Sequence, residues 1–185
     1  MGLRGRTNLI NETFFFVTTT VVKFLNVFKD DFACSLLIKT IKYYQQKYQF
    51  NILAYVIMPS HFHWIVEVKP ELGTISEIMR DIKKYSAWEL MDYLKTNKKY
   101  SAVFEIEAEK YPDQQRKFWM KRFDDVVIRN EKMLWTKIKY IHNNPVEAGL
   151  VGYPEEYKYS SARNYINNDH SVIFVDTKLA GSKFY

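Results

Sequence analysis

The stretch Tyr55-Val-Ile-Met-Pro-Ser-His-Phe-His-Trp-Ile-Val-Glu-Val68 decides the fold, because it predicts two strands joined by a tight turn. Pro59-Ser60 is the turn signal, and the residues on either side are mostly apolar, aromatic or β-branched. Side chains alternate along a strand, so His61 and His63 share one face. Two imidazoles with Cβ atoms about 7 Å apart can bind one cation, although two ordinary half-exposed histidines have the same spacing.

The composition is that of a globular chain of 185 residues, 47% hydrophobic and 26% charged, long enough for one domain with a proper core. The net charge of +6 suits a polyanionic partner without requiring one. The single cysteine, Cys34, cannot form an internal disulfide, and its apolar surroundings favour a buried thiol in a reducing compartment. Neither a run of about 18 apolar residues nor a signal-peptide core is visible, so we expect a cytoplasmic protein without a membrane partner.

Outward from the hairpin, the patterns predict the order strand–helix–strand–strand–helix–strand, followed by a further helix. Thr74 and Glu77 predict a capping box at the start of the second helix, and Pro145 predicts the end of the last one near Asn144. The fourth strand is open to interruption at Asp124-Asp125. The strands are expected over residues 12–22, 52–58, 61–68 and 118–128, and the helices over residues 30–48, 75–94, 131–144 and 160–165.

This order is that of the split βαβ motif, so the predicted fold class is α+β. We expect a ferredoxin-like antiparallel sheet with helices on one face and an added C-terminal helix that carries a tyrosine. Such a sheet keeps its other face for a site or a partner. A single domain is expected over residues 1–165, with the polar residues 95–117 as a loop or insertion, and a C-terminal tail over residues 166–185.

The last long helix, Glu131-Lys-Met-Leu-Trp-Thr-Lys-Ile-Lys-Tyr-Ile-His-Asn-Asn144, has an apolar stripe that predicts its core face. Tyr140 and Asn144 are four residues apart on an adjacent flank, so their side chains are neighbours. If that flank faces the histidine strand, Tyr140 supplies a nucleophile and Asn144 an oxygen ligand. His142 points elsewhere by helical phase, and a core tyrosine is the alternative for Tyr140.

Two motifs resemble a known family. Met58-Pro-Ser-His-Phe-His63, followed by Tyr140-Ile-His-Asn-Asn-Pro-Val-Glu-Ala-Gly-Leu-Val151, is similar to the HUH single-tyrosine transposases of insertion sequences, in particular to the REP-associated tyrosine transposases. The stretch from Phe118 to Arg129 and the tail from Tyr157 to Arg163 also resemble that branch. The resemblance covers roughly residues 10–165, and it implies a ferredoxin-like fold and metal-assisted nicking and rejoining of single-stranded DNA.

Carried over residue by residue, the resemblance implies that His61 and His63 are the metal pair, Tyr140 the nucleophile and Asn144 the third ligand. Other branches have glutamine at the position of Asn144. Two neutral imidazoles and an amide leave Mg²⁺ or Mn²⁺ strongly Lewis-acidic, and the sequence favours neither ion. The expected product is a 5′-phosphotyrosine with a free 3′-hydroxyl. No nucleotide cofactor is expected, because the few glycines form no phosphate loop.

Basic residues are candidate DNA contacts, each with a solvated surface charge as the alternative. One set is Arg80, Lys83 and Lys84 with Trp88 on the second helix, and the other is Lys110, Arg116, Lys117, Lys121 and Arg122. Lys137 stands one turn before Tyr140 and is a further candidate, as are Arg4 and Arg6.

Glu67 shares the histidine face, where a plain solvent-facing glutamate is favoured over a metal-supporting group. Asp124 and Asp125 are either turn residues or ligands.

The main hypothesis is a transposase that acts on single-stranded DNA with hairpin or palindromic repeat elements. The alternative is a domesticated DNA-hairpin-binding protein with vestigial or host-directed nicking, and a third is a metal-dependent hydrolase that does not use Tyr140. Monomer and homodimer both remain open, because related transposases include dimers that exchange the tyrosine helix. The long segment after Pro145 favours docking of that helix on its own chain.

Overall fold

The hairpin at Pro59-Ser60 lies at one side of an antiparallel sheet with the strand order β2-β3-β1-β4. This is a computed structural model, and it describes residues 11–111 and 115–179. The order is that of a ferredoxin-like split βαβ sheet, which confirms the predicted α+β class. The strands are β1 (Phe14–Thr20), β2 (Asn51–Met58), β3 (His61–Glu67) and β4 (Asp124–Val127).

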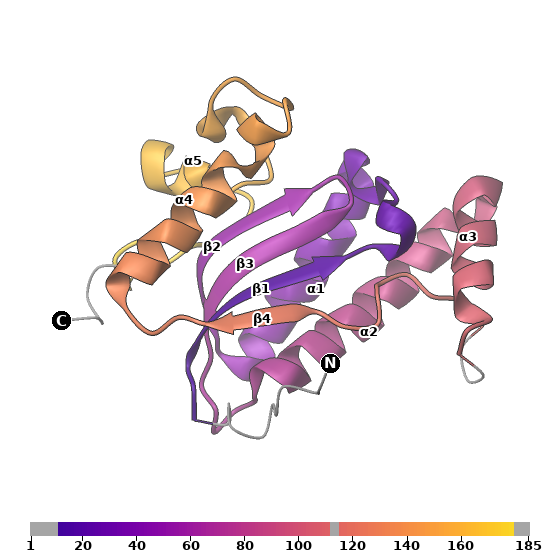
Figure 1. Ribbon diagram of the computed structural model, residues 1–185, viewed down its shortest axis with the longest axis horizontal. Helices are drawn as coiled ribbons and strands as arrows, with labels where there is room; N and C mark the ends of the chain where they lie inside the picture. The colour runs from indigo at the N-terminus through magenta and orange to yellow at the C-terminus, as the bar shows by residue number, and fades with distance from the viewer. Residues whose placement is uncertain (1–10, 112–114, 180–185) are drawn as a thin grey trace.

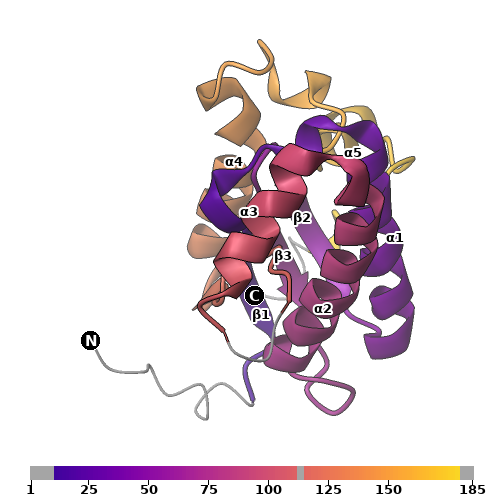
Figure 2. The ribbon, with the colours of Figure 1, turned by 90° about the vertical axis from the view of Figure 1, so that its right-hand side faces the viewer.

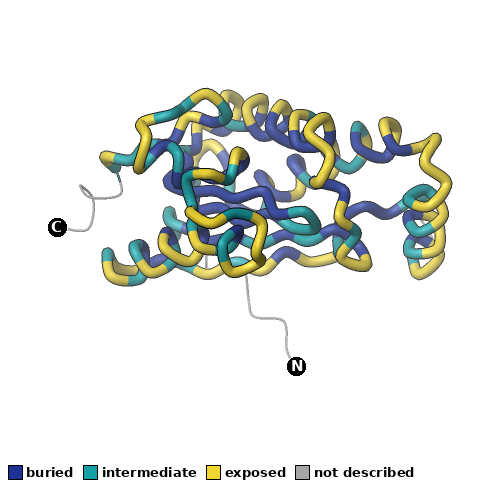
Figure 3. The backbone as a smooth tube through the Cα atoms, turned by 90° about the horizontal axis from the view of Figure 1, so that it is seen from above, coloured by how far each residue is buried: buried dark blue, intermediate teal, exposed yellow. Residues whose placement is uncertain are grey.

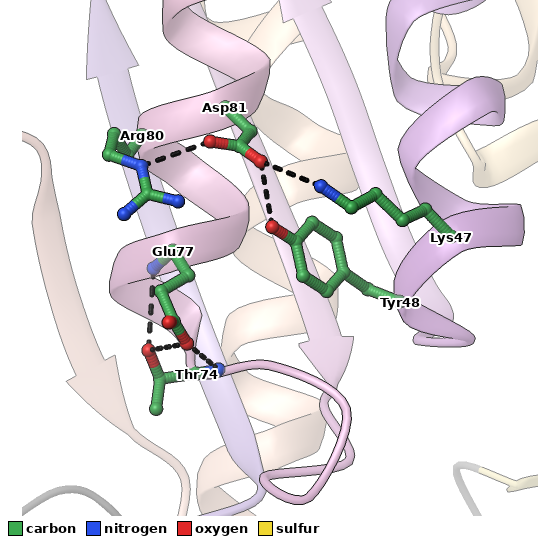
Figure 4. Close-up of polar contacts among 6 residues, drawn as sticks. All are labelled: Lys47, Tyr48, Thr74, Glu77, Arg80 and Asp81. Carbon is green, nitrogen blue, oxygen red and sulfur yellow. Dashed lines mark hydrogen bonds and ion pairs between the residues drawn. The ribbon is translucent and has the colours of Figure 1, made fainter.

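The helices lie on both sides of this sheet (Figures 1 and 2). They are α1 (Asp31–Tyr48), α2 (Ile75–Tyr93), α3 (Lys98–Ala108), α4 (Glu131–Glu147) and α5 (Ala162–Asn167). The predicted capping box is confirmed: the Thr74 hydroxyl accepts a hydrogen bond from the Glu77 amide at 3.3 Å, and Glu77 Oε2 accepts one from the Thr74 amide at 2.9 Å (Figure 4). Within the described residues, short 3₁₀ turns span residues 22–24, 27–29, 94–96 and 154–156.

The alternation of β1 divides the core into two clusters. Phe15 and Val17 pack with the apolar residues of α1 and α2, whereas Phe16 packs with Leu134 and Ile138 of α4. Strands β1, β2 and β3 each contribute to both clusters, and the sheet is the buried layer in the middle of the molecule (Figure 3). The face that carries α4 is the one on which His63 lies, because its ring stacks on Phe16.

Residues 95–117, predicted to be a loop or an insertion, contain a helix, so the loop alternative was wrong for residues 98–108. Asn97 caps α3 by accepting a hydrogen bond from the Tyr100 amide at 3.4 Å. Only Phe104 and Ala108 of this helix are buried, four residues apart. Two apolar positions make a stripe too narrow to reveal a helix among so many polar residues.

Two predicted boundaries also shift. The fourth strand is shorter than residues 118–128, because regular pairing with β1 covers only Asp124–Val127, with an isolated bridge from Val21 to Trp119. The last helix continues past Pro145 to Glu147. The missing proline N–H falls in the last turn of α4, where the amide of Ala148 still donates to the carbonyl of Asn144 at 3.0 Å.

The chain after α4 folds back along the free edge of β2. The amide of Ile57 donates to the carbonyl of Tyr159, and the amide of Ser161 donates to the carbonyl of Tyr55, both at 2.9 Å. Farther along, the amide of Asp176 donates to the carbonyl of Ile52 at 2.9 Å. This edge is therefore covered by the same chain that carries α4, and α4 is held on its own sheet.

A buried carboxylate links α1 to α2 on the opposite face of the sheet (Figure 4). Asp81 accepts hydrogen bonds from Tyr48 Oη at 2.7 Å, from Arg80 Nε at 3.0 Å and from Lys47 Nζ at 3.2 Å. Burial opposes the charge, but these donors outweigh it and lower the pKa of Asp81. Gly73 passes so close to Tyr48 that a Cβ there would lie 2.4 Å from the ring.

We predict that Asp81→Ala lowers the free energy of unfolding by about 2 kcal/mol, because it leaves the buried Tyr48 hydroxyl without its acceptor. The folded-state pKa of Asp81 is lowered, so its contribution is complete above the ordinary carboxyl pKa and is lost as the pH falls through the folded value. The difference in urea-unfolding free energy between wild type and variant should therefore be constant above about pH 4 and narrow as the pH falls below it. Asp92→Ala, which removes an exposed partner of Lys95, should change stability by less than about 0.5 kcal/mol. Equal losses in the two variants would contradict the assignment.

Candidate active site

The two histidines of β3 lie together on the face covered by α4. Their ring centroids are 4.7 Å apart, which confirms that they share one side of the strand. His63 is buried, with 5% of its surface exposed, whereas His61 is partly exposed at the end of the strand next to the turn. The pair therefore has one ring held by the protein and one ring that borders solvent.

Helix α4 brings Tyr140 and Asn144 to this pair. Asn130 caps the helix by accepting from the Met133 amide at 2.9 Å, and the apolar stripe is buried as predicted, with Leu134, Ile138 and Ile141 at most 2% exposed. This orientation places the Tyr140 ring 5.4 Å from the His63 ring, between centroids. Asn144 lies beside His61, whose pKa its side chain raises, and Nδ2 of Asn144 donates to the carbonyl of Tyr140 at 3.2 Å. All four predicted residues meet within one chain.

Phe16 on β1 joins the same cluster and was not among the predicted site residues. Its ring stacks on His63 at 5.7 Å and meets Tyr140 edge-on at 5.9 Å. Lys137 Nζ lies 4.6 Å from the Phe16 ring centroid and 5.8 Å from that of Tyr140. Lys137 is thus the cation nearest the phenol by these contacts, within reach of a negative charge formed there.

The site favours neutral imidazoles. Burial lowers the pKa of His63 to about 3, and the charges of His61 and Lys137 act in the same direction. Burial also lowers the pKa of His61, against an opposing hydrogen bond with Asn144. Both rings are therefore uncharged at neutral pH, the form in which a ring nitrogen offers its lone pair to a cation.

The donor set fits a divalent cation only if the amide of Asn144 takes part. Among residues 11–111 and 115–179, no group of three or more His, Cys, Asp or Glu side chains gathers as a metal site. His61, His63 and Asn144 supply two imidazoles and an amide, a mixed nitrogen and oxygen set that suits Mn²⁺ or Mg²⁺ with coordination positions left for other oxygens.

His142 lies on the other side of α4, as its helical phase predicted. Its Nε2 is 2.9 Å from the Ser161 hydroxyl, and burial lowers its pKa to about 4.

Glu67 is buried rather than solvent-facing, so that prediction was wrong: it accepts a hydrogen bond from Asn51 at 2.8 Å. It stands at the far end of β3 from His61, six residues along the strand. Asp124 and Asp125 belong to β4, so they are strand residues rather than turn residues.

A basic cavity of about 590 Å³ lies between α2 and the segment before β4, away from Tyr140. It brings together Arg80, Lys83, Lys84, Arg116, Lys117, Lys121 and Arg122. No acidic side chain lines it among the described residues. Some of these cations also have protein partners: Lys83 Nζ donates to the Met120 carbonyl at 2.8 Å.

The remaining candidate DNA contacts are scattered. Lys110 pairs with Glu107 at 2.8 Å, and Trp88 is 66% exposed on α2. Lys137 lies at the active site rather than at the cavity. Arg4 and Arg6 fall outside the described residues.

No helix in the described part of the chain has the length and apolar character needed to cross a membrane.

Comparison with known proteins defines the class. The chain matches the model of the IS200-like transposases over residues 16–144, which is more than half of its length. The protein therefore belongs to the IS200-like transposase family. The match runs from Phe16 to Asn144, so it includes the histidine pair and Tyr140.

Two similar proteins belong to one branch. A candidate REP-associated tyrosine transposase from Haemophilus influenzae is 27% identical over 121 residues, which cover 63% of this chain and 61% of that protein. The chain thus spans less than two thirds of this relative. The solved structure of a REP-associated tyrosine transposase bound to a REP hairpin is similar at a TM-score of 0.63 and 21% identity, covering 90% of this chain and 87% of the other. This likeness shows that the two share a fold.

We predict that His63 in the metal-free protein stays neutral down to about pH 3, and that Lys137→Met raises its pKa because a neighbouring positive charge is removed. The unfolded chain takes up this proton near the ordinary pKa of about 6.5, so acidification below that value favours unfolding. Ring-proton NMR titration measures both effects. Lys139→Met, which alters an exposed lysine of the same helix, is the control. A wild-type pKa in the ordinary range would contradict the described packing.

Proposed function

We propose that this protein is a metal-dependent strand transferase that nicks and rejoins single-stranded, hairpin-associated DNA through a 5′-phosphotyrosine on Tyr140. The observation that carries the proposal is the 5.4 Å approach of the Tyr140 ring to His63 within one chain. A core tyrosine would be buried, whereas Tyr140 is 42% exposed beside two neutral imidazoles. That exposure leaves room for a phosphodiester.

The chemistry balances without a nucleotide cofactor. The phenolic oxygen of Tyr140 attacks the phosphorus, and the bond from phosphorus to the 3′-oxygen breaks. The phenol loses its proton, and the leaving 3′-oxygen gains one to become a 3′-hydroxyl. Attack by a 3′-hydroxyl on the phosphotyrosine reverses the step and rejoins a strand. His61, His63 and Asn144 would hold Mg²⁺ or Mn²⁺, which supplies Lewis-acid stabilisation of charge on the phosphate when bound. Lys137, whose Nζ lies 5.8 Å from the Tyr140 ring centroid, would supply a positive charge beside the phosphate that is attacked.

The basic cavity supports DNA as the partner. Like charges gathered in one cavity repel one another, and a phosphate backbone relieves that repulsion. The cavity is bordered by α2, on the opposite side of the sheet from α4 (Figure 2). We propose that it binds a part of the DNA other than the phosphate that Tyr140 attacks. The relative that was solved with a REP hairpin supports a structured DNA element as the ligand.

We also propose that one chain carries a complete site. The segment after α4 covers the edge of β2 and fastens α4 to its own sheet. A monomer therefore needs no exchanged tyrosine helix. The lone buried Cys34 supports a reducing compartment such as the cytoplasm as its location.

We predict that wild type forms a covalent adduct with labelled single-stranded hairpin DNA in Mn²⁺ or Mg²⁺, and that Tyr140→Phe forms none because it lacks the attacking oxygen. Denaturing gel electrophoresis detects the adduct. Tyr153→Phe, which alters a tyrosine that is 66% exposed outside the site, should retain full activity. Free cleavage product from both wild type and Tyr140→Phe would indicate a hydrolase, and DNA retardation without cleavage would indicate a hairpin-binding protein. No adduct across a broad set of hairpins contradicts the proposal.

A charge reversal in the cavity should weaken DNA binding without removing the chemistry. We predict that Arg122→Glu raises the Kd for hairpin DNA and lowers the slope of log Kd against log salt by about one for each lost phosphate contact. Lys39→Glu makes the same change of net charge at a lysine that pairs with Glu89 at 2.9 Å, and it should leave the slope unchanged. Fluorescence anisotropy at several salt concentrations measures both. Equal slopes for the two variants would exclude the cavity as the binding surface.

A further inference from the structure

Thr18 of β1 lies directly opposite His63 in the strand register, and its Oγ1 is 2.7 Å from Nδ1 of that ring. This contact occupies one ring nitrogen, so Nε2 is the nitrogen left for a cation. We propose that Thr18 is a positioning residue: its oxygen accepts a hydrogen bond from Nδ1–H of His63, which keeps Nε2 unprotonated. The inference rests on the proposed function, because it concerns the same metal site.

The direction of the hydrogen bond follows from the proposed cation site. A hydroxyl can donate or accept, so distance alone does not assign the proton. A neutral imidazole carries one hydrogen, and a ring that offers the lone pair of Nε2 to a cation carries that hydrogen on Nδ1. Nδ1–H of His63 then donates to Thr18 Oγ1, which accepts at 2.7 Å.

The orientation of the ring is fixed independently of its protonation. Phe16, two residues before Thr18 on the same face of β1, stacks on His63 with only 16° between the ring planes. The stack resists rotation of the imidazole, while Thr18 selects which nitrogen carries the hydrogen. Positioning of this kind by a hydrogen bond to the second ring nitrogen is usual for histidine ligands of metals.

The second histidine, His61, has a similar contact between its Nδ1 and the hydroxyl of the preceding residue. Ser60 Oγ lies 3.2 Å from Nδ1 of His61. Both Nδ1 atoms thus face a hydroxyl of the chain, from β1 in one case and from the hairpin turn in the other. Thr18 makes the shorter contact, to the more deeply buried ring, so it is the residue on which the inference is tested.

The test compares Thr18→Val, which keeps the shape of the side chain and removes the oxygen, with Thr18→Ser, which restores the oxygen. Nitrogen-15 NMR of the metal-free, DNA-free protein reports which nitrogen of neutral His63 carries the hydrogen. We expect Nδ1–H in wild type and in Thr18→Ser, and a loss of that preference in Thr18→Val. Calorimetry with Mn²⁺ in a Tyr140→Phe background should show affinity about 10- to 100-fold weaker for Thr18→Val.

The neighbouring threonine is a matched control. Thr19 is 2% exposed on the other face of β1, and its Oγ1 has no hydrogen-bond partner among the described residues. Thr19→Val should leave the NMR pattern and Mn²⁺ affinity unchanged. A wild-type His63 with the hydrogen on Nε2, or a Thr18→Val protein that keeps the wild-type pattern, overturns the inference. If wild type binds no Mn²⁺, the proposed metal site fails, and the NMR pattern still decides the role of Thr18.

Discussion

The two-residue alternation of β3 is the constraint on which the rest of the molecule depends. Phe62 and Trp64 point into the core under α1 and α2, so His61 and His63 must point to the other face. A register slip of one residue would bury both imidazoles in the main core and move two large aromatic rings to the face under α4. The packing that stabilises the sheet is therefore also what presents the candidate ligands to α4.

The second requirement is that α4 lies on that face in a fixed orientation. Its buried stripe packs on β2 and β3, and the chain that follows is bonded along β2 from Tyr159 to Asp176. This return segment covers a strand edge that would otherwise be open to another sheet. This segment thus explains both why Tyr140 lies on the sheet of its own chain and why the edge of β2 is covered.

Much of this arrangement follows from local sequence patterns. The hairpin, the capping box before α2 and the stripe of α4 are periodic or short-range features, and helical phase also separated His142 from Tyr140. Phe16 and Thr18 were missed because their roles depend on which residues of β1 face β3, a long-range register that one strand does not encode. Glu67 was misjudged for the same reason: its partner Asn51 comes from a neighbouring strand. The polar sequence of α3 concealed a helix that only tertiary contacts reveal.

The central claim is that His61, His63 and Asn144 form one cation site beside Tyr140 of the same chain. The most direct test is an anomalous-difference map, recorded at the manganese edge, from crystals of Tyr140→Phe grown with Mn²⁺. The account predicts one peak within bonding distance of Nε2 of both histidines and Oδ1 of Asn144, with residue 140 of that chain adjacent. Manganese bound elsewhere, or no peak at saturating Mn²⁺, would contradict it.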